Sequence, residues 1–254
     1  MPSPVPDHAL SRRVEEAGLN AWPAPRQILL DGWLLRCVGG PSRRVNAVTP
    51  LRSSEQPLGD KIAACEALYA AQGQPAIFRL PGIVEPALDA ELARRGYRAE
   101  GETCVLYRSL DGAAGAADPQ VILQPAPDDI WLAALAALQG QDERHRQASR
   151  QVLESLMLPA RFAALAVDGA IAALAMVAIH DGMASLNLVA TSREHRRSGL
   201  ARRVLNTALS WARTAGATGA CLQVEAGNAP ARALYADIGF TRELYRYHYR
   251  RQAG

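Results

Sequence analysis

Lysine is almost absent from this chain of 254 residues: Lys61 is the only one, and arginine carries the rest of the positive charge. The formal net charge is only +3, which provides no strong one-signed field for a polyanion. We therefore expect no nucleic-acid partner. Arginine- and alanine-rich composition with so little lysine indicates a GC-rich genome rather than a function.

Cysteine is also scarce, and its spacing carries no metal or redox motif. Cys37, Cys65, Cys104 and Cys221 are far apart, form no CxxC pair and have no histidine close by in the sequence. This pattern argues against zinc and against a disulfide framework, and it is typical of a reducing compartment. We expect no metal and a cytoplasmic location.

No apolar run is long enough to span a bilayer. The run from Ala163 to Ile179 is interrupted by Asp168-Gly169, and the N-terminus, MPSPVPDHAL, has no basic region followed by an apolar stretch. We expect neither a membrane span nor a signal peptide.

A segment rich in glycine, alanine and aspartate, DGAAGAADPQ at 111–120, separates two patterned halves. It is typical of a linker. We predict domains at 1–112 and 120–254, joined by a linker at 113–119. Strands and helices are mixed in both halves, which predicts an α/β fold, of the mixed α+β kind, with a mostly antiparallel sheet flanked by helices.

In the first half we expect a helix from Asp7 to Gly18, and one strand at 28–38 before a strand at 43–50. Helices at 58–71 and 86–95 and strands at 76–80 and 104–107 complete it. The segment from AIFRL to CVLYR resembles a later one from ACLQV to YRYHYR. Both predict strand, helix and strand, which suggests two copies of one fold.

In the second half, Asp168-Gly169 and Asp181-Gly182 separate three apolar runs between residues 162 and 191. Asp-Gly between apolar runs is a strong hairpin signal, so we predict three antiparallel strands. Helices are expected at 128–138, 147–156, 199–215 and 228–238. We predict a final strand at 245–249, and the alternation in RELYRYHYRR (242–251) indicates that it lies at an edge of the sheet.

The chemistry is carried by the loop between the third of these strands and the helix that begins near Gly199. The backbone N–H groups of a helix start have no internal partners, and the helix dipole favours an anion there. Glycine lets a ligand approach the backbone closely, and arginine adds charge. We predict a pyrophosphate site built by six consecutive residues: Arg196, Arg197, Ser198, Gly199, Leu200 and Ala201.

These residues match R/Q-x-x-G-x-G/A, and with LNLVAT before and VEAGNAPARALYADIGF after, residues 120–250 resemble the GNAT superfamily of N-acetyltransferases. The loop TPLRSSEQPLGDKIAA of the first half has no such motif. The chain is therefore similar to tandem GNAT proteins in which one copy, here the N-terminal one, has lost cofactor binding.

The resemblance implies direct attack of an amine on the acetyl-CoA thioester. It implies that a backbone N–H of Leu188, Val189 or Ala190 polarises the carbonyl. Tyr235 is implied as the acid for the leaving thiolate, since a phenol with a pKa of ~10 is protonated at neutral pH; the alternative is simple packing. Asn228 is implied as a pantetheine contact, although an N-cap explains it equally well.

The general base is left open among Glu225, Asp142, Glu143 and His145. The partners implied are acyl-CoA and a primary amine of a small molecule or a peptide, and either a monomer or a homodimer is compatible. A non-catalytic acyl-CoA-binding sensor is the alternative function. A phosphate-loop enzyme is disfavoured because GxxxxGK[ST] is missing.

Overall fold

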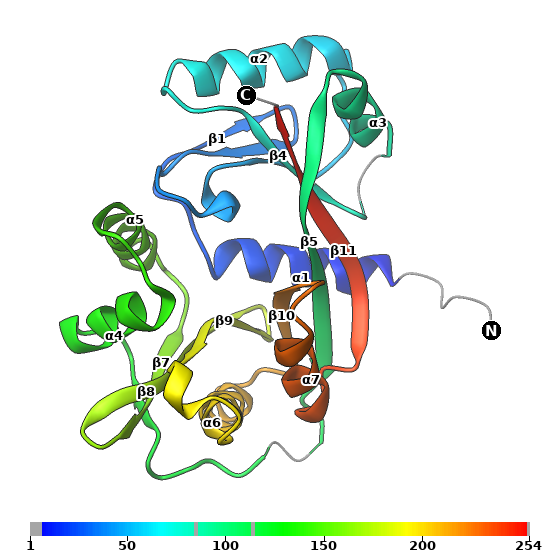
Figure 1. The fold of residues 1–254 in the computed structure, drawn as a ribbon. Coiled ribbons are helices and arrows are strands. Elements are labelled where there is room, and N and C mark those ends of the chain that lie inside the picture. Colours follow the sequence, from blue (N-terminus) through cyan, green and yellow to red (C-terminus); the bar gives the residue numbers. More distant parts are fainter. Residues whose placement is uncertain (1–6, 84–85, 113–114, 253–254) are drawn as a thin grey trace.

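The structure, a computed structural model, describes residues 7–83, 86–112 and 115–252. Within these residues, eleven strands form one continuous sheet in the order β1-β2-β3-β4-β11-β5-β10-β9-β8-β7-β6. Helices cover both faces of this sheet (Figure 1). Neighbouring strands are antiparallel except in the pairs β3–β4 and β9–β10. The predicted fold class, a mixed fold with a mostly antiparallel sheet flanked by helices, is confirmed.

The described residues of the first half form three helices, a 3₁₀ helix and five strands. They are α1 (His8–Asn20), β1 (Gln27–Leu30), β2 (Trp33–Arg36), η1 (Arg43–Val45), β3 (Val48–Pro50), α2 (Leu58–Ala70), β4 (Ile77–Pro81), α3 (Pro86–Arg94) and β5 (Tyr97–Ser109).

In the second half, the residues that the structure describes form four helices, a 3₁₀ helix and six strands. They are β6 (Ile122–Gln124), α4 (Asp129–Gln139), α5 (Glu143–Glu154), β7 (Ala160–Val167), β8 (Ala170–His180), β9 (Met183–Thr191), η2 (Arg193–His195), α6 (Leu200–Thr214), β10 (Gly219–Glu225), α7 (Ala229–Asp237) and β11 (Arg242–Gln252). The three predicted strands between 162 and 191 are confirmed as β7, β8 and β9.

The two segments that resemble each other in sequence are β4–α3–β5 and β10–α7–β11, and their strands interleave at the centre of the sheet. β11 pairs with β4 and β5, both from the first half. β5 in turn pairs with β11 and β10, both from the second half. Figure 1 shows β5 and β11 running side by side from one lobe to the other. The last strand of each half is therefore bounded by strands of the other.

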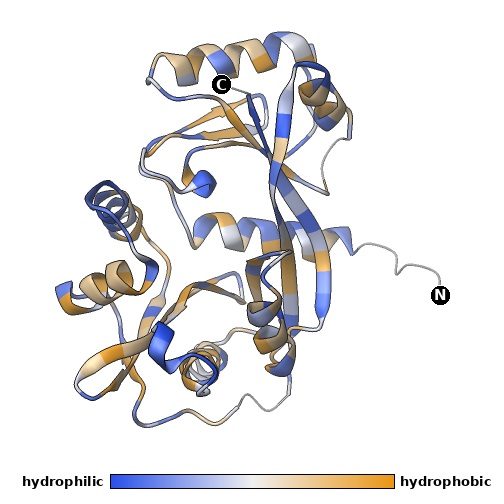
Figure 2. Cartoon of the chain, in the orientation of Figure 1, coloured by the Kyte–Doolittle hydropathy of each residue, from blue (hydrophilic) through white to orange (hydrophobic). Residues whose placement is uncertain are grey.

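The expectation that β11 is an edge strand is wrong. Figure 2 shows hydrophilic colour along much of β11, in contrast to the hydrophobic β7 and β8. Its polar side chains are tolerated at the centre because they are paired: His248 and Arg250 both contact Asp89 of α3, at 2.9 and 2.7 Å. On the opposite face its tyrosines are buried in the core.

Domain boundaries at 112 and 120 stay a prediction, and residues 113 and 114 lie outside the described residues.

The expectation of a single strand at 28–38 is also wrong. Asp31 (φ 42°) and Gly32 (φ 77°) form a tight turn between β1 and β2, with the same left-handed geometry as Asp168-Gly169 and Asp181-Gly182. The hairpin signal that locates β7–β9 is thus present here as well. Residues 43–45, expected at the start of a strand, form η1 instead.

Helix limits differ from expectation at two places. Gly18 does not end α1, which continues to Asn20. A Cβ atom on Gly18 would lie 2.8 Å from Nε2 of Gln223, so this glycine permits α1 to pack closely on β10. The helix expected from residue 147 begins at Glu143, where the Asp142 side chain caps it.

The helices are divided between the two faces by the alternation of the strands. Cys221 of β10 packs in one cluster with Val14 and Ala17 of α1. Ala220 and Leu222, its neighbours, pack in another cluster with α6 and α7. α6 therefore covers the face opposite α1, and its N-terminus lies beside the end of β9. No helix in the described ranges is long and apolar enough to cross a membrane.

Candidate active site

The N-terminus of α6 is the one that the motif predicts as an anion site. Gly199 occupies the N-cap position with φ 83°, and no side chain caps this helix. The side chains of Asp7, Asp128, Asp142 and Asn228 cap α1, α4, α5 and α7, whereas α2, which follows Pro57, also has no side-chain cap. The first-turn N–H groups of α6 are therefore left for a ligand.

Two residues near this helix adopt a backbone conformation that L-residues rarely take. Among the described residues other than glycine, five have positive φ, and three of them are the aspartates of Asp-Gly turns. The other two are Leu188 (φ 56°) and Arg197 (φ 63°), both among the predicted cofactor contacts. Such a conformation is costly for a leucine or an arginine, and strained residues of this kind are typical of functional sites.

Leu188 lies in a β-bulge of β9. Ala190 is opposite Leu174 of β8, but Asn187 is opposite Met176, so β9 holds one extra residue in this interval. On its other side, β9 pairs with β10 only over Met183–Leu186. Beyond Leu186 the two parallel strands diverge. On the side that faces β10, no strand in the described part of the chain therefore pairs with β9 at Leu188, Val189 and Ala190.

The loop before α6 carries uncompensated positive charge. Arg196 and Arg197 are exposed, and no carboxylate in the described part of the chain lies within ion-pair distance of either. Leu200 is buried in the core and anchors the helix start, whereas Ser198, Gly199 and Ala201 are exposed or partly exposed. A Cβ on Gly199 would meet no atom within 4 Å, so the space beside its backbone is open. These residues fit a pyrophosphate.

A cavity of about 400 Å³ lies where β9 and β10 diverge. Its lining includes Leu188 and Val189 of β9, Glu225 of β10 and Tyr235 of α7. Tyr235 is only 7% exposed, and its ring meets Phe240 edge-on with centroids 6.3 Å apart. Burial raises the pKa of Tyr235 to about 12, so its hydroxyl is protonated at neutral pH. The cavity thus brings together Tyr235 and the bulged part of β9.

The remaining predicted residues have these positions. Asn228 caps α7, accepting a hydrogen bond from the N–H of Ala231 at 3.2 Å. Glu225 lines the cavity, but its side chain is 68% exposed and lies 3.5 Å from Arg43. Asp142 accepts a hydrogen bond from the His145 N–H as the cap of α5. Glu143, in the same helix, pairs with Arg146 at 3.2 Å.

The first half supplies cavity residues that sequence reasoning missed. Arg43 and Arg44 of η1 line the same cavity as Tyr235 of α7. Arg44 donates to Oδ1 of Asn187 at 3.1 Å and to Oε1 of Gln223 at 3.2 Å, so it bridges β9 and β10 where they separate. No local motif points to these residues, because about 140 to 180 positions of chain separate them from their partners.

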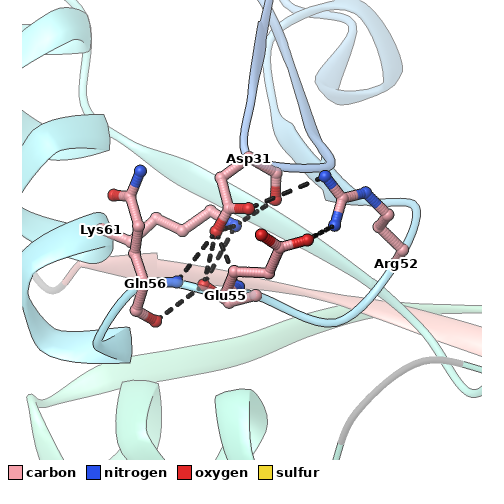
Figure 3. A network of polar contacts seen from close by, with 6 residues as sticks. Asp31, Arg52, Glu55, Gln56 and Lys61 are labelled. Carbon is pink, nitrogen blue, oxygen red and sulfur yellow. Dashed lines mark hydrogen bonds and ion pairs between the residues drawn. The ribbon is translucent and has the colours of Figure 1, made fainter.

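The corresponding loop of the first half, between β3 and α2, is already filled by an internal carboxylate (Figure 3). Asp31 accepts hydrogen bonds from the N–H groups of Glu55 and Gln56, at 2.9 and 3.2 Å. The hydroxyl of Ser54 and the ammonium of Lys61 also donate to it, at 2.9 and 3.0 Å. A larger cavity, of about 830 Å³, borders this loop and α1. In this loop the N–H groups of Glu55 and Gln56 are therefore already bonded to Asp31.

Solved structures share this fold. A GCN5-related N-acetyltransferase from Kribbella flavida superimposes with a TM-score of 0.65 at 16% identity, over 99% of this chain and 97% of that one. At this identity the likeness defines the fold, which is that of the GNAT proteins. Among the described residues, no three His, Cys, Asp or Glu side chains cluster in a way that could hold a metal ion.

Residues 9–250 match the family model described as Probable histone acetyltransferase Rv0428c C-terminal, and the chain belongs to this family. The chain is 27% identical over 243 residues to Uncharacterized N-acetyltransferase YobR of Bacillus subtilis, covering 94% of this chain and 97% of that protein. It is 36% identical over 124 residues to Probable histone acetyltransferase Rv0428c of Mycobacterium tuberculosis, covering 49% of this chain and 38% of that protein. The chain is a GNAT-type N-acetyltransferase, as the motif indicated.

Proposed function

We propose that the protein transfers an acetyl group from acetyl-CoA to a primary amine of a small molecule or peptide, by direct attack in a ternary complex. The observation that carries this proposal is the convergence of three features at the divergence of β9 and β10. They are the uncapped N-terminus of α6, the bulge at Leu188 and the buried phenol of Tyr235. We further propose a tandem GNAT arrangement in which only the second half binds the donor.

In this proposal the N–H groups of Arg197 to Ala201 hold the pyrophosphate, and Arg196 and Arg197 add charge. Support comes from the open space beside Gly199 and from the lack of a side-chain cap. Asn228, exposed at the start of α7, contacts the pantetheine arm while its Oδ1 caps the helix. In the first half, Asp31 occupies the corresponding N–H groups, so we assign that half no donor site.

The reaction forms a C–N bond and breaks the C–S bond of the thioester. A backbone N–H of Leu188, Val189 or Ala190 donates to the carbonyl oxygen as negative charge develops there. The amine attacks as a free base, and its surplus proton leaves through a base or a water chain. Tyr235 gives its hydroxyl proton to the departing thiolate. Its raised pKa, caused by burial, keeps that proton available at neutral pH.

The experiment has two parts. Millimolar acetyl-CoA is expected to raise the Tm of the purified protein, because a ligand that binds only the folded state stabilises it. A panel of amines, amino acids and peptides is then scored by release of free CoA thiol. Absence of any Tm shift contradicts the donor site. A Tm shift without thiol release for any acceptor supports a non-catalytic acyl-CoA sensor instead.

A further inference from the structure

Arg44 is a cation without a counter-ion in the cavity that holds Tyr235. Both of its protein hydrogen bonds go to neutral amide oxygens, those of Asn187 and Gln223. In the described residues no carboxylate lies within ion-pair distance of it, whereas its neighbour Arg43 pairs with Glu100 and Glu225 at 3.3 and 3.5 Å. A guanidinium that is partly removed from water without a carboxylate is costly to maintain.

The surroundings of Arg44 hold it in place and leave donors free. Its guanidinium lies 5.4 Å from the centroid of the Trp22 ring, and Trp22 is buried. The hydroxyl of Tyr247 also donates to Oε1 of Gln223, at 2.8 Å, which fixes the orientation of that amide. A guanidinium has five N–H donors, and two of those of Arg44 are used. The others have no acceptor in the described chain.

From this geometry we infer that the acceptor is an amine that carries a carboxylate, and that Arg44 binds this carboxylate. This inference rests on the proposed function and names the substrate class of the same cavity. An arginine offers a carboxylate two parallel, charge-assisted hydrogen bonds. A cavity of about 400 Å³, with Pro41 and Leu188 in its lining, suits a small amino acid or a similar amino-carboxylate. The added positive charge of a lysine-rich peptide is unfavourable beside Arg44.

This assignment also gives the first half a role. η1 belongs to the first half, yet Arg44 reaches the point where two strands of the second half separate. The donor is held by the second half, and the acceptor is recognised by a residue of the first. The cavity is incomplete without both.

The test compares acceptors that differ only by the carboxylate, such as phenylalanine with phenethylamine and tyrosine with tyramine. The wild-type protein is expected to acetylate the carboxylated member with a kcat/KM about 10- to 100-fold higher, the range of a charge-assisted pair. Arg44→Gln is expected to remove this preference by raising KM for the carboxylated member, so that the ratio of kcat/KM between the two members of each pair falls towards 1. Arg44→Lys retains part of the preference.

Arg213→Gln is the matched control, since Arg213 is exposed near the end of α6. It is expected to behave as wild type. Equal kcat/KM for both members of each pair in the wild type overturns the inference. So does an equal loss for both members in Arg44→Gln, which indicates a purely structural role.

A second readout does not depend on turnover. N-acetylphenylalanine and N-acetylphenethylamine are titrated into the protein loaded with CoA, and only the first is expected to bind, with Arg44→Gln abolishing the difference. Equal binding, or none, overturns the inference about the carboxylate. Failure of CoA itself to bind contradicts the proposed function instead, so the two failures are distinguishable.

Discussion

The ammonium group of Lys61 lies 3.0 Å from the carboxylate of Asp31, and Lys61 is fully buried. It also donates to the main-chain oxygen of Asp31 at 2.6 Å and lies 4.1 Å from the centroid of the Trp33 ring. The only lysine of the chain therefore holds in place the carboxylate that accepts hydrogen bonds from the N–H groups before α2. This pair supports the proposal that the first half binds no donor phosphate.

We expect Asp31→Asn to lower the Tm of the protein. Hydrogen bonds from Lys61 and from the N–H of Gln56 hold the pKa of Asp31 below its ordinary value, although partial burial opposes them. A lowered folded-state pKa contributes stability above the unfolded value of about 3.9, and this contribution is lost as the pH falls further. The Tm difference between variant and wild type should therefore be full at pH 7 and shrink below pH 4.

Asp168→Asn is the control, because Asp168 has the same left-handed turn geometry but is exposed. It should leave the Tm almost unchanged at either pH. A similar loss of Tm in both variants assigns the effect to the turn rather than to the pair with Lys61.

Gly199→Glu is expected to abolish the rise in Tm that acetyl-CoA produces. The new side chain adds negative charge at the N-terminus of α6 and fills the open space beside its backbone. It also forces an L-residue into a left-handed conformation, which costs roughly 1–2 kcal/mol.

Gly216→Glu is the control that distinguishes a loss of acetyl-CoA binding from a loss of stability. Gly216, just after the other end of α6, also has positive φ (93°) and open space at its Cβ position. It should lose stability similarly and keep the response to acetyl-CoA. If both variants respond to acetyl-CoA as wild type does, the donor site lies elsewhere.

Tyr235→Phe tests whether Tyr235 is the acid that protonates the leaving thiolate. The variant should keep the Kd of acetyl-CoA and lose kcat by about 100-fold, the lower end of the contribution of a positioned acid. Since burial raises the pKa of Tyr235 to about 12, the phenol stays protonated through neutral and mildly alkaline pH. Wild-type kcat should show no alkaline decline from this group in that range. Tyr107→Phe, in β5, serves as the control and should retain wild-type kcat.

Glu15 of α1 links that helix to the central strands. Arg79 of β4 donates to it through two nitrogens, and the Tyr245 hydroxyl of β11 donates to it at 2.5 Å. Burial alone raises the pKa of Glu15, but Arg79 outweighs burial, so the carboxylate is ionised in the folded state. Glu15→Gln leaves Arg79 buried without its counter-charge, and the free energy of unfolding should fall by about 3 kcal/mol.

Urea denaturation measures this change, with Glu16→Gln as the matched control. The side chain of Glu16 is 68% exposed, so its loss should change the free energy of unfolding by less than about 0.5 kcal/mol. Equal effects at the two neighbouring positions would contradict the buried pair.

Local signals predicted much of the fold, and they are also the basis of the proposed donor site. Asp-Gly turns located β7, β8 and β9, since this dipeptide adopts the left-handed conformation that tight hairpins require. Apolar spacing located α6, whose buried Leu205 and Leu209 lie on one face. The loop from Arg196 to Ala201 could be proposed from the sequence because its glycine and arginines lie within a few residues of the helix-start N–H groups on which the proposed site depends.

Strand pairing between segments far apart in the chain could not be predicted from the same local signals. Alternating charged and aromatic residues in β11 are typical of an edge strand, yet this strand lies between β4 and β5. The distinction depends on partners such as Asp89, about 160 residues away in the chain. Leu188 is an unremarkable leucine in the sequence, and only the mismatch between β8 and β9 forces its φ to 56°.

The motif from Arg196 to Ala201 and its flanking strand and helix were sufficient to indicate the class of the protein, and they are the basis for the proposed donor site in the second half. They suffice because backbone N–H groups at a helix start are set by a few consecutive residues. The tertiary structure alone decided which side chains share the cavity with Tyr235. Arg44 belongs there because the interleaving of β4, β11, β5 and β10 joins the halves, and such strand pairing is long-range and has no local signature.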